Sequence, residues 1–244
     1  MIQKFFSAIL SVLFFPCFFG CLIIFHVIQV FCRHVFGKKA HKKSVDIFNF
    51  FLLRCVNIAG NTTNYTCKYS FPENTPLLIV SNHQSMFDIS MIVWYMRKVS
   101  PHFVSKMELG KGIPSISYNL RHGGSVLIDR SNKRQSLAKL MEFGKRLHKN
   151  NETGVIFPEG TRSRDGVPKT FSESGLKILT RSMPNGYVIP VTLNNSWKLM
   201  RYGNFPIGGF SNVTLEVHKP IKIDSCTFDE LLERTKRQIT LAIK

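Results

Sequence analysis

Residues 77–88 read Leu77-Leu78-Ile79-Val80-Ser81-Asn82-His83-Gln84-Ser85-Met86-Phe87-Asp88. The apolar run at 77–80 predicts a buried strand, and residues 89–97 predict the beginning of a helix. Between them, a polar cluster with one His and one Asp lies at a strand-to-helix turn. Because α/β proteins commonly carry their chemistry at such turns, this stretch predicts both a fold class and a candidate site.

His83 and Asp88 have the residue types of a base and its supporting carboxylate. Imidazole accepts a proton near neutral pH, and a carboxylate can hold its other ring nitrogen in the right tautomer. Five positions along a regular helix separate two side chains by roughly 140°, so the pair meets only if His83 lies in the turn and Asp88 in the first helical turn. An Asp there also suits the positive end of the helix dipole. The alternative is that Asn82 or Ser85 caps the helix and His83 is a surface loop residue.

The composition predicts a polyanionic neighbour. The 244 residues carry a formal net charge of +18, which suits nucleic acid, an anionic membrane surface or phosphorylated ligands. The 21 Phe residues and an apolar N-terminal segment favour the membrane, and no nucleic-acid-binding module is recognisable. The six Cys include no Cys-x-x-Cys pair and predict a reducing compartment without disulfides. The eight His show no metal-ligand spacing, so no metal site is predicted.

A segment without charged residues, 5–25, predicts a membrane anchor. Its roughly 21 positions measure ~31 Å as a helix, which is enough to cross the apolar core of a bilayer. Pro16 and Gly20 keep open a bent, re-entrant hairpin within one leaflet. A cleaved signal peptide and a buried helix of a soluble protein are weaker alternatives.

A basic run and a second apolar pattern follow this segment. Residues 37–43 contain four Lys, and such runs attract anionic head groups and keep their side of the membrane cytoplasmic; the alternative is a solvated charge run. Residues 45–59 repeat apolar side chains at helical spacing and predict a helix that lies along the interface or packs on the first. The polar break at 60–64 divides the chain into a membrane-associated helical segment, 1–60, and a main domain, 61–244.

The main domain alternates predicted strands and helices. Strands are expected at 65–71, 77–81, 102–105, 125–128, 154–157, 187–193 and 213–217, and helices at 89–97, 113–120, 133–149 and 173–182. Residues 72–76 are expected to turn the first strand back into the second. Thr227-Phe228-Asp229-Glu230 is a capping box that opens a final amphipathic helix. This alternation predicts an α/β fold in which helices flank a mixed sheet.

A second polar cluster follows the predicted strand at 154–157 and reads Phe157-Pro158-Glu159-Gly160-Thr161-Arg162-Ser163-Arg164. Gly160 lets the backbone approach a ligand closely. Thr161 offers a hydroxyl, and Arg162 offers a forked set of donors that suits phosphate. The alternative is a basic surface loop in which Glu159 pairs with Arg162.

Together the two clusters resemble the glycerolipid acyltransferase family, in particular its bacterial-type 1-acyl-glycerol-3-phosphate acyltransferases. The resemblance rests on Asn82-His83-x-x-x-x-Asp88 and on residues 157–163, and smaller blocks at 106–109, 124–130 and 188–191 follow in the family's order. It extends over roughly residues 60–220. The sequence differs from the family pattern at Leu127, where the family often has Phe. This difference bears only on the details of the pocket for the acyl chain.

The resemblance implies the glycerolipid acyltransferase fold and transfer of a fatty acyl chain from a thioester to the sn-2 hydroxyl of lysophosphatidic acid, which gives phosphatidic acid. His83 would be the general base, and Asp88 would orient it. Glu159, Gly160, Thr161 and Arg162 would bind the glycerol phosphate, and Arg130 and Lys106 would add positive charge. No cofactor or metal is implied, and the co-substrate is acyl-CoA or acyl carrier protein. The protein is expected to be located at the membrane, with its catalytic domain on the cytoplasmic side.

Three other functions stay open. In the first alternative, the reaction is the same but the acceptor is another lysolipid or glycerol-3-phosphate. A non-catalytic, membrane-anchored protein that binds anionic lipid is the second. An esterase is the third, although the chain has no Gly-x-Ser-x-Gly elbow and Ser85 is interpreted as a helix cap. The sequence leaves the donor, the chain length, the mode of insertion and the oligomeric state undetermined.

Overall fold

A mixed sheet of eight strands runs through the computed structural model, which describes residues 2–244. Its order is β1-β7-β6-β2-β5-β3-β4, and β8 pairs with β6. The strands are β1 (Thr62–Cys67), β2 (Leu77–Ser81), β3 (Pro101–Lys106), β4 (Val126–Ile128), β5 (Thr153–Ile156), β6 (Tyr187–Asn194), β7 (Asn212–Val217) and β8 (Ile221–Lys222). The strands β6, β2, β5, β3 and β4 are parallel, whereas β7 and β8 run antiparallel to β6. The carboxyl ends of the five parallel strands therefore share one edge.

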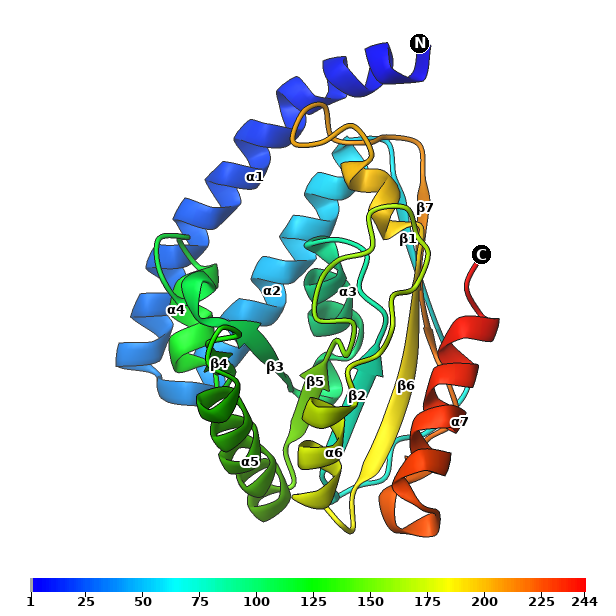
Figure 1. The fold of residues 1–244 in the computed structure, drawn as a ribbon. Coiled ribbons are helices and arrows are strands. Elements are labelled where there is room, and N and C mark those ends of the chain that lie inside the picture. The colour runs from blue at the N-terminus through cyan, green and yellow to red at the C-terminus, as the bar shows by residue number, and fades with distance from the viewer. Residues whose placement is uncertain (1) are drawn as a thin grey trace.

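Helices cover both faces of the sheet (Figure 1). They are α1 (Ile2–Val35), α2 (Gly37–Ile58), α3 (Phe87–Tyr95), α4 (Ile116–His122), α5 (Lys133–Asn150), α6 (Glu173–Arg181) and α7 (Phe228–Leu241), with short 3-10 turns η1 (Arg97–Val99), η2 (Met107–Gly110), η3 (Ser196–Met200) and η4 (Ile223–Ser225). Leu77 and Ile79 of β2 pack into the core under α1–α3, while Leu78 and Val80 pack into the core under α5–α7. A strand buried on both faces needs such a continuous apolar run, which is why residues 77–80 carry no polar side chain.

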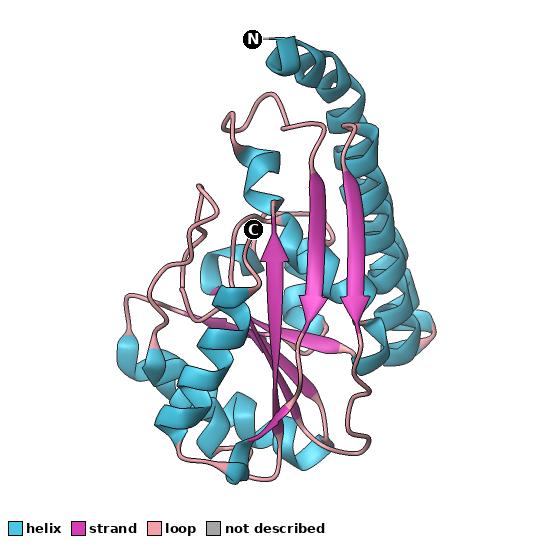
Figure 2. Cartoon of the chain, turned by 90° about the vertical axis from the view of Figure 1, so that its right-hand side faces the viewer, coloured by secondary structure: helices cyan, strands magenta, loops and turns pink. Residues whose placement is uncertain are grey.

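The two N-terminal helices lie side by side on one face of the sheet (Figures 1 and 2). α1 is one continuous helix of 34 residues with Pro16 inside it, so the structure has no hairpin within 5–25. Phe25 of α1 packs against Phe48 of α2 with ring centroids 5.6 Å apart. Near its beginning, the Ser7 and Ser11 hydroxyls of α1 accept hydrogen bonds from the backbone of the 207–209 loop. α1 is long and apolar enough to cross a membrane.

Two expectations were wrong in detail, and one strand was not expected. The first strand spans 62–67 rather than 65–71, and it pairs in parallel with β7 at the sheet edge instead of turning back onto β2. The second helix begins at Gly37 rather than at 45, because residues 38–43 are four Lys, one Ala and one His, with no Pro or Gly among them. The two-residue strand β8 was not expected. The first helix continues to Val35, ten residues beyond the uncharged segment 5–25. The other elements agree with the expected ones within a few residues, and the capping box is formed: Thr227 N–H donates to Glu230 Oε2 at 2.9 Å.

Candidate active site

The residues singled out in the sequence gather at the carboxyl edge of the parallel strands. His83 follows β2, Lys106 ends β3, and Arg130 follows β4, while Glu159, Gly160, Thr161 and Arg162 follow β5. These strands are neighbours in the sheet. Parallel strands deliver the segments that follow them to a common edge, which is where open α/β sheets bind ligands.

His83 and Asp88 are in direct contact. His83 Nδ1 lies 2.8 Å from Asp88 Oδ2. Asp88 is the second residue of α3, so its carboxylate folds back onto the turn that carries His83. The same oxygen accepts the backbone N–H groups of Gln84 at 2.6 Å and Ser85 at 2.9 Å. A carboxylate at Nδ1 assigns the ring proton to that nitrogen and leaves the Nε2 lone pair free to accept a proton.

The other oxygen of Asp88 is held by a residue that the sequence did not indicate. Ser196, in the turn after β6, donates its hydroxyl to Asp88 Oδ1, and its backbone N–H donates to Gln84 Oε1 at 3.1 Å. Ser196 and Asp88 are fully buried. Because 108 positions separate the two residues, no local pattern connects them. Ser85 Oγ accepts the N–H of Phe87 at 3.2 Å, but the N-cap of α3 is Met86 and has no side-chain capping bond, so Ser85 supports the turn from the position before the cap.

The segment after β5 fixes the backbone and the ring of His83. His83 N–H donates to Glu159 Oε1 at 2.9 Å, and His83 C=O accepts the N–H of Ser163 at 2.8 Å. The imidazole stacks on the Phe157 ring with centroids 4.1 Å apart and an interplanar angle of 18°. With 16% of its side chain exposed, His83 has a defined orientation and still meets solvent.

Glu159 joins two loops. Its Oε2 accepts the N–H of Lys169 at 3.0 Å, in addition to the bond from His83 to Oε1. Burial raises the pKa of Glu159, and these two hydrogen bonds oppose the rise. Both oxygens are thus engaged by the chain, so Glu159 supports the loop; its contact with a substrate stays a prediction.

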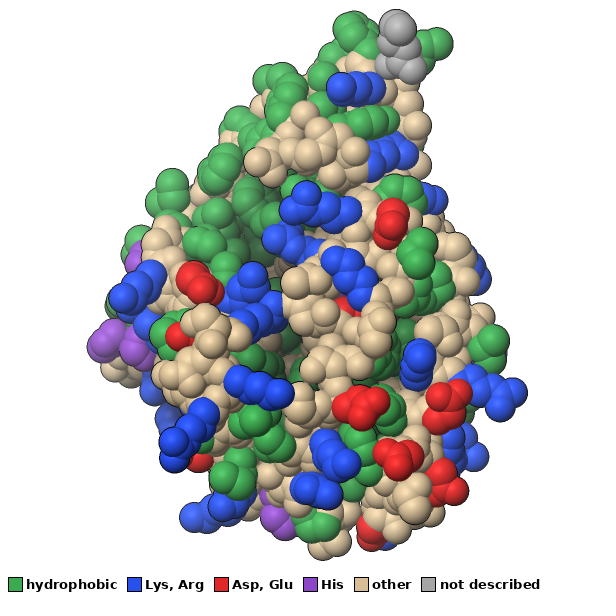
Figure 3. Space-filling view, in the orientation of Figure 1, with side chains coloured by type: hydrophobic (Ala, Val, Ile, Leu, Met, Phe, Trp, Pro, Cys, Tyr) green, Lys and Arg blue, Asp and Glu red, His purple; other side chains and the backbone are tan. Residues whose placement is uncertain are grey.

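Cationic side chains surround this edge. Arg162 and Lys106 are exposed, and Arg130 donates to the carbonyl oxygen of Gly160. Gly160 has φ +70°, a conformation that favours glycine, and faces open space. The Thr161 hydroxyl accepts a hydrogen bond from Lys169 Nζ at 3.0 Å. On the face seen in Figure 3, Lys and Arg side chains gather around a hollow whose floor is hydrophobic.

A cavity of about 1090 Å³ opens beside the site. Its nearer end is lined by Arg162, Met86, Phe87 and Ser105. His83 is not part of the lining, but its ring stacks on the ring of Phe157. The ring centroid of Phe157 lies 6.4 Å from that of Phe103, which does line the cavity, so His83 is separated from the cavity wall by one side chain. Further apolar walls come from α1, α2, α3, α4 and the loop before α4: Phe18, Phe48, Leu52, Val93, Ile113, Ile116 and Leu120. Among residues 2–244, no group of three or more His, Cys, Asp or Glu is placed to hold a metal ion.

Known proteins resemble the chain in sequence and in structure. The model of the family described as Acyltransferase matches residues 62–194. A 1-acyl-sn-glycerol-3-phosphate acyltransferase of Helicobacter pylori is 28% identical over 211 residues, which are 80% of this chain and 85% of that protein. The chloroplastic 1-acyl-sn-glycerol-3-phosphate acyltransferase LPAT1 of Arabidopsis thaliana is 32% identical over 61% of this chain, and the match spans 40% of its own length.

A solved structure shares the fold. The crystal structure of the 1-acyl-sn-glycerophosphate (LPA) acyltransferase PlsC from Thermotoga maritima superposes with a TM-score of 0.81 at 22% identity. The match covers 97% of this chain and 94% of that chain. The predicted fold class, a mixed sheet flanked by helices with a long apolar helix at the N-terminus, is confirmed.

Proposed function

This chain belongs to the acyltransferase family, and from that premise we propose that it transfers a fatty acyl group from a thioester to the sn-2 hydroxyl of lysophosphatidic acid, which gives phosphatidic acid. The 2.8 Å contact between His83 Nδ1 and Asp88 Oδ2, at the same edge as Arg162, is the observation that carries the proposal. The names of the relatives support the same acceptor.

The chemistry follows from the free Nε2 of His83. Nε2 takes the proton of the acceptor hydroxyl, and the oxygen attacks the thioester carbonyl. The carbon–sulfur bond breaks, and the proton leaves with the thiol. The negative charge of Asp88 stabilises the imidazolium that forms in between. Since the substrate supplies the nucleophile, no acyl-enzyme is formed.

The acceptor phosphate is assigned to the loop after β5 and its neighbours. Arg162 is exposed and lies at the opening of the cavity, and a guanidinium binds phosphate through two parallel hydrogen bonds. Arg130 and Lys106 add positive charge from the adjacent strands, and the backbone at Gly160 and the hydroxyl of Thr161 are open to the glycerol. The acyl chain is assigned to the apolar part of the cavity, beside Phe87 and Phe103.

The protein is expected to work at a membrane. Apolar residues of α1 that are more than half exposed include Phe5, Val12, Leu13, Phe19, Ile23, Ile24, Val27 and Phe31, and such a surface favours lipid over water. We assign residues 1–60 to a membrane-associated helical segment and residues 61–244 to the acyltransferase domain; α2 of the first segment also packs over the sheet. The Lys-rich beginning of α2 favours a cytoplasmic catalytic side, and the net charge of +18 suits either anionic donor, acyl-CoA or acyl carrier protein.

A thiol-release assay tests the proposal, with both donors and a panel of lysophosphatidic acid, glycerol-3-phosphate and other lysolipids. We expect thiol release that requires lysophosphatidic acid, and a loss of about 10²- to 10⁴-fold in His83→Ala, the range that a general base supplies. His148, a partly exposed residue of α5, gives the control His148→Ala, which should keep full activity.

Each other outcome contradicts the proposal in its own way. Release without any acceptor would indicate a thioesterase, and release with a different acceptor would correct the substrate. Lipid binding without any thiol release would indicate a binding protein. Wild-type activity in His83→Ala would remove the base from the mechanism.

A further inference from the structure

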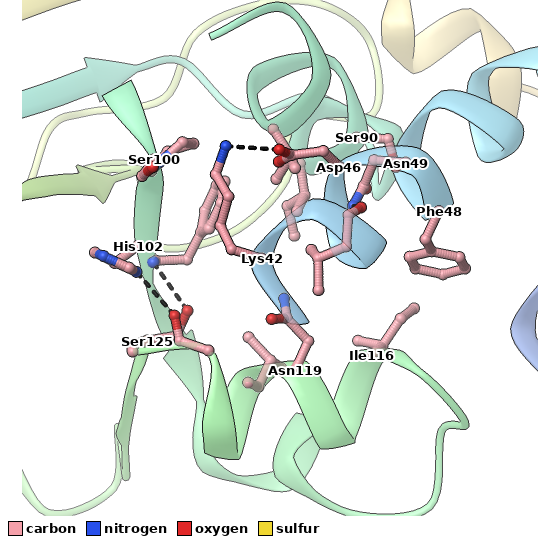
Figure 4. Close-up of a pocket in the computed structure, with 18 of the residues that line it drawn as sticks. Lys42, Asp46, Phe48, Asn49, Ser90, Ser100, His102, Ile116, Asn119 and Ser125 are labelled. Carbon is pink, nitrogen blue, oxygen red and sulfur yellow. Dashed lines mark hydrogen bonds and ion pairs between the residues drawn. The ribbon is translucent and has the colours of Figure 1, made fainter. Parts of the chain in front are cut away.

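Two phenylalanines of the loop that joins η3 to β7, residues 201–211, are turned away from the protein. Phe205 is 57% exposed and Phe210 is 52% exposed. Phe48 shows the more usual place of such a ring, since it is buried and lines the cavity (Figure 4). Residues 206–209, which lie between the two exposed rings, are buried. The loop therefore hides its middle and exposes an aromatic ring on either side of it.

The buried part of the loop is fixed to α1 and to the end of α2. Ile207 N–H donates to the Ser11 hydroxyl at 3.0 Å, and Gly209 N–H donates to the Ser7 hydroxyl at 3.2 Å. A Cβ at position 209 would lie 2.6 Å from the carbonyl oxygen of Ala59, so only glycine permits this close approach. The loop cannot turn its rings inward without breaking these contacts.

The backbone fixes the direction of Phe210. Its φ of +60° lies in the left-handed region, which residues other than glycine seldom occupy. A Cβ at Gly60 would lie 3.1 Å from the Phe210 ring and 3.4 Å from the Leu10 side chain of α1, so the ring is placed close to that helix. A conformation of this kind persists only where the surrounding structure holds it, and here it directs an aromatic ring to the surface.

The ring of Phe205 continues the apolar surface of α1. It stacks on the Phe15 ring with centroids 5.9 Å apart, and Phe15 stacks on Phe19 with centroids 6.1 Å apart. Phe19 belongs to the exposed apolar surface of α1 that is assigned to the membrane. Figure 1 shows the loop lying across the N-terminal half of α1. The loop thus adds its rings to one end of that surface.

Cationic side chains accompany these rings. Lys4 Nζ lies 5.7 Å from the centroid of the Tyr202 ring, and the guanidinium carbon of Arg201 lies 4.9 Å from the same centroid. No acidic residue occurs in the loop or in the chain before Asp46. Aromatic rings together with Lys and Arg are typical of the boundary between a membrane and water, and cations are attracted to anionic head groups. This composition favours lipid as the partner of the loop.

We propose that the 201–211 loop is a second membrane contact, in which Phe205 and Phe210 enter the lipid interface beside α1. The inference rests on the proposed function, under which α1 binds the membrane, and it adds an element of the acyltransferase domain to that contact. Contacts from two elements fix the orientation of a protein on a membrane more fully than a single helix does. Because β7 follows the loop directly, the sheet and the opening of the cavity would be held in that orientation.

The first test places a tryptophan in the loop. Phe205→Trp and Phe210→Trp are each compared with the unsubstituted protein, so that the emission of Trp94 and Trp197 is subtracted. With vesicles of phosphatidylcholine and phosphatidylglycerol, we expect the added emission to move to shorter wavelength and to be quenched by brominated lipid. The control Met141→Trp, at an exposed position of α5 on the other face of the sheet, should show neither effect.

The second test measures the strength of binding. Phe205→Ala with Phe210→Ala should bind these vesicles about 10- to 100-fold more weakly, because two half-exposed rings no longer enter the lipid. Phe205→Leu with Phe210→Leu keeps the apolar surface and should bind within about threefold of the unsubstituted protein. Both variants should keep thiol release with a short-chain lysophosphatidic acid that dissolves as a monomer, since no residue within 201–211 lines the cavity.

The outcomes separate this inference from the proposed function. Emission that is neither shifted nor quenched at both loop positions, while the protein binds vesicles, overturns the inference alone. So does full vesicle binding by the alanine variant. A shift that occurs without lipid, in a protein that sediments as a dimer, would assign the two rings to a second copy of the chain and overturn it too. Absence of thiol release from the unsubstituted protein overturns the proposed reaction, whereas absence of vesicle binding overturns the membrane assignment and the inference with it.

Discussion

At the scale of single residues, the imidazole of His83 is oriented by contacts from two segments of the chain, the first turn of α3 and the segment after β5. Asp88 binds Nδ1, Phe157 stacks on the ring, and Glu159 and Ser163 hold the backbone. A base that is fixed in this way needs no reorganisation when it accepts a proton. The sequence predicted the His83–Asp88 pair because both residues lie within one turn of chain.

Ser196 marks the limit of that reasoning. A single serine 108 positions from its carboxylate partner has no spacing that distinguishes it from other serines. Glu159 shows a similar limit: the family resemblance implied a contact with substrate, and only the fold shows that both its oxygens accept backbone N–H groups.

We predict that Ser196→Ala lowers kcat about 10-fold with little change in KM, because one hydrogen bond to a buried carboxylate contributes ~1.4 kcal/mol or more. The loss should appear in kcat because Ser196 acts on Asp88, which orients His83, and touches no substrate. The measurement is the steady-state rate of thiol release over a range of acceptor concentrations. Ser211→Ala removes another buried hydroxyl, one beside Gly209, and should leave both kcat and KM in place; a merely structural Ser196 would lower thermal stability and leave kcat unchanged.

At the scale of elements, the periodic spacing of apolar residues predicted those helices and strands whose buried face is visible within the element's own sequence. The helices α5 and α6 and the strands β2, β3 and β5 fall within about three residues of the expected ranges, because their buried faces repeat at the helical or strand period. The error at β1 has a different origin. In β1, exposed and partly buried side chains alternate, a pattern that fits a strand at either edge of a sheet. The pattern therefore predicted a strand but did not indicate that its partner is β7, which lies 150 positions further along the chain.

At this scale we predict that the exposed apolar face of α1 binds the membrane. Ile23 and Val27 are 61% and 66% exposed, and moving each side chain from water into lipid contributes about 1.5–3 kcal/mol. The double variant Ile23→Asp with Val27→Asp should therefore weaken vesicle binding by more than about 10²-fold while the thermal unfolding temperature stays within a few degrees. Vesicle sedimentation and a melting curve measure the two effects.

Leu241, which is 76% exposed at the end of α7, gives the matched control. α7 lies on the other face of the sheet from α1 (Figure 1), so Leu241→Asp should leave vesicle binding unchanged. Equal losses in the two variants would mean that α1 has no special role at the membrane.

At the scale of the whole molecule, charge is the property that the sequence states most directly. The net charge of +18 predicts anionic partners without indicating where they bind. The fold supplies the location, since parallel strands bring Lys106, Arg130 and Arg162 to the edge that holds His83. The order of the strands could not be predicted, because pairing between distant segments leaves no local pattern.

This charge predicts a salt effect on substrate capture. In neutral detergent micelles, where membrane charge has no part, the KM for the anionic acyl donor should rise several-fold as ionic strength rises from about 0.01 M to about 0.15 M, since the screening length falls from about 30 Å to about 8 Å. The kcat should stay constant because His83 and Asp88 are too close together for salt to screen. A KM that is independent of salt would show that the donor binds without help from the basic surface.

The pairing of β2 with β5 has one more consequence. It brings His83 and Glu159 together although 76 positions separate them. The intervening chain contains Asp88, which binds His83, and β3, which pairs with β5. The segment between β3 and β4, however, carries α4, which walls the cavity, and none of the residues that contact His83. Its length and its apolar side chains can therefore change, and with them the acyl chain that fits, while the His83–Asp88 pair stays in place.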